Sequence, residues 1–120
     1  MMRILYVEDQ PLLQLDGEGS LIAAGYDVVV ASNGEEACAH LRGPGPGFDG
    51  IVTDIDLPGS AKGWRVAELG REIAAGMAVI YVTGEAGRDF ERLGVPHSLL
   101  VSKPFEWDGL VPRLSRLLAA

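Results

Sequence analysis

Five short, mostly apolar segments recur along the chain and alternate with segments that carry helical signals. The apolar segments are Ile4 to Val7, Val28 to Ala31, Gly50 to Thr53, Ala78 to Val82 and Leu99 to Ser102. Short runs with little polar alternation are typical of parallel strands that are covered on both faces. A strand-then-helix rhythm with right-handed crossovers predicts an α/β fold: one doubly wound, five-stranded parallel sheet flanked by five helices.

The first predicted helix begins near Pro11 and ends before Gly25. Its apolar residues fall on one helical face, which predicts the buried side: Leu12, Leu15, Ile22 and Ala23. The closing helix is predicted from the strong helical spacing of Leu110, Val111, Leu114, Leu117 and Leu118.

Three further helices are predicted between these two. Ser32 with Glu35 forms a capping-box pattern for a helix from about Gly34 to Leu41. The next helix carries Val66, Leu69, Gly70 and Ile73 at helical spacing, and Trp64 at its start is expected to be a packing anchor. The fourth helix, around 88–93 in a glycine-rich stretch, is expected to be short or irregular.

Composition narrows the classes of function. The chain has 120 residues, the size of one domain, with 48% apolar and 22% charged residues. A net charge of −7 leaves no basic patch, which argues against nucleic acid or an anionic membrane as a direct partner. The single cysteine, Cys38, cannot form an internal disulfide, and no run has the length of a membrane span, so we expect a cytoplasmic protein.

Polar residues follow four of the predicted strands at their C-terminal ends. They are Glu8 and Asp9, Asp54, Thr83 and Lys103. Parallel strands present these ends at one edge of the sheet, so the carboxylates should converge and require a cation. Mg²⁺ suits a few carboxylates that share a site with a phosphoryl group. An aspartate can attack phosphorus to form an acyl phosphate, and the central Asp54 is the candidate.

Taken together, these motifs resemble the receiver domain of two-component response regulators over essentially the whole chain. They are Glu8-Asp9, Asp54 with Leu57-Pro58-Gly59 beyond it, Thr83-Gly84 and Lys103-Pro104-Phe105. The resemblance implies that residues 1–120 form one receiver domain with the flavodoxin-like strand order 2-1-3-4-5. It also implies that a sensor histidine kinase or phosphotransfer protein donates a phosphoryl group to Asp54. A downstream protein would then bind the face formed by the fourth helix, fifth strand and fifth helix.

The same resemblance assigns roles to the other site residues. Asp9 and Asp54 would ligate Mg²⁺, Glu8 would act mainly through water, Asp56 would offer its backbone carbonyl, Thr83 and Lys103 would bind the phosphoryl oxygens, and Pro104 would follow a cis peptide bond. Asp56 and Glu85 match positions that influence hydrolysis of the acyl phosphate. Leu100 departs from the family pattern, because receivers usually carry Tyr or Phe there as a rotamer switch.

Two alternatives remain open at this point. A degenerate receiver would keep the fold as a binding module without being phosphorylated, and an aspartate-nucleophile phosphatase would use Asp56 as general acid. Otherwise we expect no enzyme beyond the chain's own phosphorylation and dephosphorylation. His40 and His97 are each isolated, and Cys38 is expected to be a small buried residue. No output domain follows residue 120, so we expect either a stand-alone receiver or one excised from a longer chain.

Overall fold

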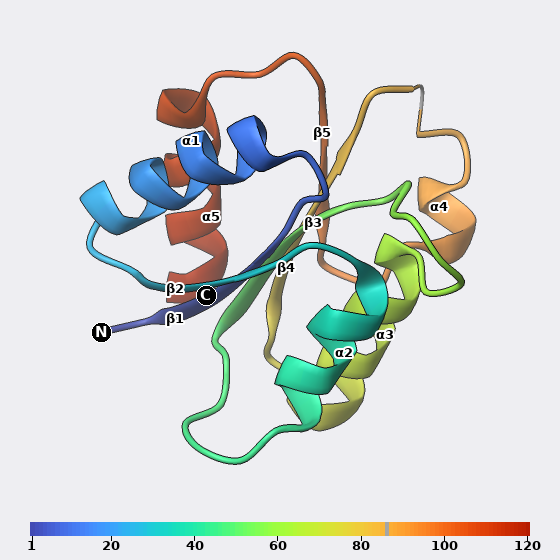
Figure 1. The fold of residues 1–120 in the computed structure, drawn as a ribbon, viewed down its shortest axis with the longest axis horizontal. Helices are drawn as coiled ribbons and strands as arrows, with labels where there is room; N and C mark the ends of the chain where they lie inside the picture. The colour runs from blue at the N-terminus through green and yellow to red at the C-terminus, as the bar shows by residue number, and fades with distance from the viewer. Residues whose placement is uncertain (86) are drawn as a thin grey trace.

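A five-stranded parallel sheet forms the centre of the computed structural model, which describes residues 1–85 and 87–120 (Figure 1). The strands are β1 (Arg3–Val7), β2 (Asp27–Ala31), β3 (Gly50–Asp54), β4 (Ala78–Thr83) and β5 (Leu99–Ser102). Their spatial order is β2-β1-β3-β4-β5, and every neighbouring pair is parallel. The fold and strand order that the resemblance implied are therefore confirmed, and each strand boundary lies within one residue of the prediction.

Helices cover both faces of the sheet. They are α1 (Pro11–Ala23), α2 (Gly34–Arg42), α3 (Gly63–Ile73), α4 (Phe90–Leu93) and α5 (Trp107–Ala119). Figure 1 shows α1 and α5 on one side, α2 and α3 on the other, and α4 beyond α3. Within the described part of the chain, no helix is long and apolar enough to cross a membrane.

The core consists of two apolar clusters, one on each face of the sheet. Alternate residues of β1 show why: Leu5 faces the cluster under α2 and α3, whereas Ile4 and Tyr6 face the cluster under α5. Leu110 and Leu114 of α5 are both buried in the second cluster. Because β1, β3 and β4 are covered on both faces, their sequences lack polar alternation.

The predicted buried face of α1 is wrong. Leu12, Leu15 and Ile22 are 82%, 69% and 55% exposed, while Gly17 and Leu21 face the interior. The Tyr6 and Trp107 rings meet edge to face, and a Cβ at Gly17 would overlap both of them. The large side chains in this contact therefore come from β1 and α5, and α1 places Gly17 against them.

The predicted capping box is also wrong, by one residue. Asn33 is the N-cap of α2, and its side chain accepts a hydrogen bond of 2.7 Å from the backbone N–H of Glu36. Glu35 instead accepts a bond of 3.1 Å from the N–H of Ala61 in the β3–α3 loop.

Two other helix predictions are revised in detail. On α3 the predicted core residue Ile73 is 52% exposed, while Val66, Leu69 and Gly70 are buried as expected. The fourth helix is short, as predicted, but it spans only four residues and begins at Phe90.

Candidate functional site

An acidic cluster lies where β1 and β3 end. Glu8 and Asp9 follow β1 and Asp54 closes β3; Val7 pairs with Thr53 across these neighbouring strands. One carboxylate oxygen from each acid lies within 4.8 Å of the others. Glu8 and Asp54 are 3% and 7% exposed, whereas Asp9 is exposed. The sheet therefore brings together the three carboxylates that the sequence predicted at one edge.

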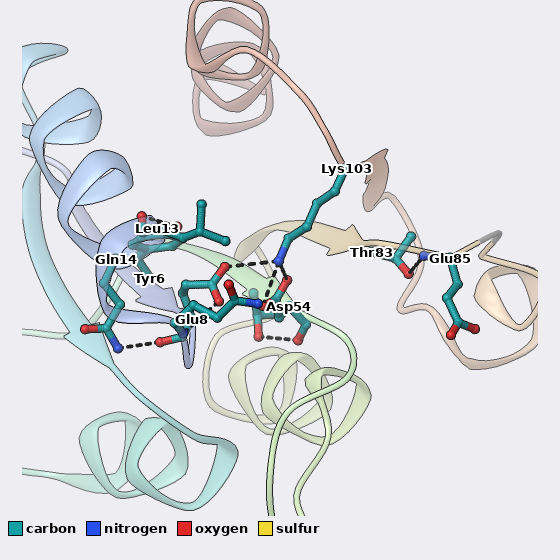
Figure 2. A network of polar contacts seen from close by, with 10 residues as sticks. Tyr6, Glu8, Leu13, Gln14, Asp54, Thr83, Glu85 and Lys103 are labelled. Carbon is teal, nitrogen blue, oxygen red and sulfur yellow. Dashed lines mark hydrogen bonds and ion pairs between the residues drawn. The ribbon is translucent and has the colours of Figure 1, made fainter.

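Lys103, which follows β5, reaches into this cluster (Figure 2). Its Nζ lies 2.9 Å from Oδ1 of Asp54, 3.1 Å from Oδ2 and 3.2 Å from Oε1 of Glu8. The peptide bond between Lys103 and Pro104 is cis, as the resemblance implied. One ammonium leaves two negative charges unbalanced when all three carboxylates are ionised.

Glu8 is held by contacts that the sequence did not reveal. Its Oε2 accepts a bond of 3.1 Å from the N–H of Gln10, and its carbonyl accepts a bond from Nε2 of Gln14. Gln14 also donates to Oγ of Ser32 at 2.8 Å, so it joins the ends of β1 and β2. A single polar residue in the first turns of a helix carries no sequence signal for this role.

Thr83 lies at the end of β4, on the other side of the site. It is 3% exposed, and its Oγ1 accepts a bond of 3.1 Å from the N–H of Glu85 (Figure 2). A cavity of about 350 Å³ joins Thr83 to the acidic cluster. Its lining is Asp9, Gln10, Asp54, Asp56, Val82, Thr83, Gly84, Glu85 and Lys103. The side chains of Asp56 and Glu85 are exposed at its rim.

Burial is the main influence on the ionisation of Asp54. It raises the pKa of this carboxyl to about 7, with Glu8 adding to the rise and Lys103 opposing it. Burial alone lowers the pKa of Lys103, but its contacts with Asp54 and Glu8 outweigh that effect and the net shift is upward. Carboxylate oxygens are hard ligands, and the unbalanced charge of the cluster matches a divalent ion, so the donor set fits Mg²⁺.

The raised pKa predicts that Asp54 destabilises the fold at alkaline pH. Its folded value near 7 exceeds the ordinary 3.8, so between these values the folded state holds more protons than the unfolded state. The free energy of unfolding therefore falls as pH rises. We expect Asp54→Asn to be more stable than the wild type at pH 8, on the order of 2 kcal/mol, and this gain to shrink toward pH 5. Thermal unfolding of the wild type and Asp54→Asn in a chelating buffer, from pH 5 to pH 8, measures this difference in stability. A difference that does not change with pH would contradict the prediction.

Comparison with known proteins identifies the family that the sequence motifs of the site resemble. The family model described as the response regulator receiver domain matches residues 4–115. The chain therefore belongs to the response regulator receiver family. Receiver domains of this family are signalling modules of two-component systems, and they interact with histidine kinases and phosphotransfer proteins.

Individual relatives agree with this assignment. The transcriptional regulatory protein TrcR of Mycobacterium tuberculosis is 32% identical over 119 residues, which are 98% of this chain and 45% of TrcR. The probable transcriptional regulator ycf27 of Porphyra purpurea is 31% identical over 117 residues, 97% of this chain and 47% of that protein. The chain thus spans less than half the length of these two curated relatives.

Solved structures match along the whole chain. A response regulator receiver protein from Sinorhizobium medicae is 38% identical with a TM-score of 0.95, covering 99% of this chain and 95% of that one. The response regulator TrrA of Thermotoga maritima, solved with Mg²⁺ and BeF, is 29% identical with a TM-score of 0.81, covering 98% and 99% of the two chains. The receiver domain of the histidine kinase PA1611 of Pseudomonas aeruginosa, solved with magnesium in its active site cleft, is 28% identical with a TM-score of 0.82, covering 99% and 98%.

Proposed function

We propose that this receiver accepts a phosphoryl group on Asp54 from a histidine of a sensor kinase or phosphotransfer protein. The observation that carries the proposal is the buried Asp54 carboxylate, bound by Lys103 and grouped with Glu8 and Asp9 beside an open cavity. In the transfer, the phosphorus–nitrogen bond of phosphohistidine breaks and a bond from phosphorus to an Asp54 oxygen forms. The leaving imidazole nitrogen keeps the electron pair and takes up a proton.

Mg²⁺ is part of this proposal. Asp9 and Asp54 would ligate it with their side chains, Asp56 with its backbone carbonyl, and Glu8 through water. The ion would neutralise negative charge on the cluster and on the phosphoryl oxygens. Two similar receiver structures contain magnesium by their own descriptions, which supports the proposal.

Lys103 and Thr83 complete the proposed machinery. Lys103 already binds the carboxylate that would carry the phosphoryl group, so its ammonium is placed to bind a phosphoryl oxygen after transfer. Thr83 lines the same cavity and would exchange its bond with the Glu85 N–H for one to the phosphoryl group. The exposed acids Asp56 and Glu85 would tune hydrolysis, because both lie at the rim where water enters.

The proposed output is protein contact in the cytoplasm. Residues 1–120 would act as one receiver domain that signals through the face formed by α4, β5 and α5, without binding nucleic acid or membrane. A net charge of −7 supports a protein partner, and the single buried Cys38 suits a reducing compartment.

Incubation with acetyl phosphate tests the function directly. We expect the intact mass to rise by one phosphoryl group when Mg²⁺ is present, and labelling to fall by at least about tenfold in excess chelator, because the ion offsets charge in the transition state. No added mass under either condition would favour the degenerate receiver. Steady turnover of a phosphomonoester would favour the phosphatase.

A further inference from the structure

Position 100, where receivers usually carry an aromatic residue as a rotamer switch, is a leucine in this chain. Leu100 is partly buried on β5 and pairs in register with Tyr81 on β4. The loop after Thr83 packs on it closely, since a Cβ at Gly87 would overlap a Leu100 methyl group. An aliphatic side chain in this place offers no ring that could rotate between buried and exposed positions.

Tyr81 occupies the space between the sheet and α4. It is fully buried, and its ring lies 4.8 Å from the ring of Trp64 and 5.9 Å from that of Phe90, measured between centroids. Its hydroxyl accepts a bond of 3.1 Å from the backbone N–H of Val95. Tyr81 therefore contacts the first residue of α4 with its ring and the segment after α4 with its hydroxyl.

The α4 helix depends on such contacts for its position. It has four residues, and the side chain of its N-cap, Asp89, makes no capping bond. So short a helix is unstable alone, and packing must hold it in place. Tyr81 contacts Phe90 at the start of α4 and Val95 two residues beyond its end, so these contacts help to hold the helix in place.

Tyr81 is also linked to the reactive site. Tyr81 and Thr83 are two residues apart on β4, so their side chains leave the same face of the sheet. A pocket of about 120 Å³ adjoins Thr83, and Trp64, Gly87 and Asp56 are also among its lining residues. Thr83 therefore shares a pocket with Trp64, and Trp64 packs on Tyr81.

We infer that the aromatic cluster of Trp64, Tyr81 and Phe90 transmits the state of Asp54 to α4, in place of an aromatic residue at position 100. The inference rests on the proposed function, since phosphorylation is the event transmitted. Tyr81 acts as a positioning residue: it touches neither the metal ligands nor the phosphoryl group.

The test follows two probes in the full chain, with acetyl phosphate and Mg²⁺ as the phosphorylating reagents and intact mass as the record of phosphorylation. In Trp107→Phe, the tryptophan that remains is Trp64, and we expect its emission to shift on phosphorylation. In the wild type, the exchange rate of the Val95 amide should change at least about threefold on phosphorylation.

Tyr81→Phe keeps the ring and removes the hydroxyl that accepts a bond from the Val95 N–H. Because one hydrogen bond is lost, the exchange rate of the Val95 amide should rise about fivefold before phosphorylation. In Tyr81→Phe the exchange rate of the Val95 amide should then no longer change on phosphorylation.

Tyr26→Phe is the matched control. Its hydroxyl pairs with Ser115 on the other face of the sheet, so removing it should leave the Val95 response intact. Unchanged Trp64 emission in phosphorylated Trp107→Phe, or unchanged Val95 exchange in the phosphorylated wild type, would overturn the inference alone, as would a normal Val95 response in Tyr81→Phe. Wild type that gains no phosphoryl mass would overturn the proposed function, and the inference with it.

Discussion

Replacing Asp54 by asparagine is expected to reduce phosphoryl incorporation from acetyl phosphate in the presence of Mg²⁺ by at least about 100-fold. An amide oxygen carries no negative charge and cannot form the acyl phosphate. The change is nearly isosteric in a buried position, so the strands and the other carboxylates should keep their places. Intact mass and acid-labile phosphate after a fixed incubation measure the loss.

Asp56→Asn is the matched control for this experiment. Asp56 lies two residues beyond Asp54 in the loop after β3. In our proposal its backbone carbonyl would ligate Mg²⁺ and its exposed side chain would affect only the hydrolysis of the acyl phosphate. This variant should still be labelled, although the lifetime of the acyl phosphate is expected to change. Labelling of Asp54→Asn at the wild-type level, with a cooperative unfolding transition showing that the variant is folded, would rule out Asp54 as the acceptor.

The position of the candidate site was predictable from sequence because the C-terminal ends of parallel strands lie at the same edge of the sheet. Once β1, β3 and β5 are assigned, Glu8, Asp54 and Lys103 must emerge at the same end of the sheet. Uniformly apolar runs identify these strands, since both of their faces are buried. The proximity of the acids and the lysine therefore follows from local signals and one topological rule.

The sequence-based predictions were wrong, or were missing, where a residue distant in the sequence determines the local structure. The buried face of α1 depends on Trp107, a contact that local apolar spacing ignores. The cap of α2 could be either of two neighbouring polar residues, Ser32 or Asn33; Asn33 serves, and Glu35, the expected partner of Ser32, is bonded to Ala61 in another loop. The role proposed for Tyr81 had no signal in its strand, where it is one of five apolar residues in a run of six.

Gly63→Ala should destabilise the protein strongly and disturb phosphorylation at the same time. Gly63 begins α3, its N–H donates to the carbonyl of Ile55 at 2.9 Å, and a Cβ would overlap the carbonyl group of Asp54. These obstacles are backbone atoms that cannot rotate away, so the loop after β3 must shift. We expect a loss of about 3 kcal/mol, seen as a fall in Tm of more than about 10 °C, and slower labelling of Asp54.

A second helical glycine provides the contrast that isolates this effect. Gly19 lies inside α1, and apart from the backbone of its own helix nothing lies within 4 Å of the position that a Cβ would take. Gly19→Ala should therefore stabilise the chain by about 1 kcal/mol through helix propensity alone. The two substitutions add the same methyl group, and opposite signs of the change in Tm would show that contact with the Asp54 backbone is the cause. If Gly63→Ala were as stable as Gly19→Ala, α3 would not press on the end of β3. Asp54 would then be positioned by its pairing with Val82 on β4 and by the contacts of its carboxylate with Lys103.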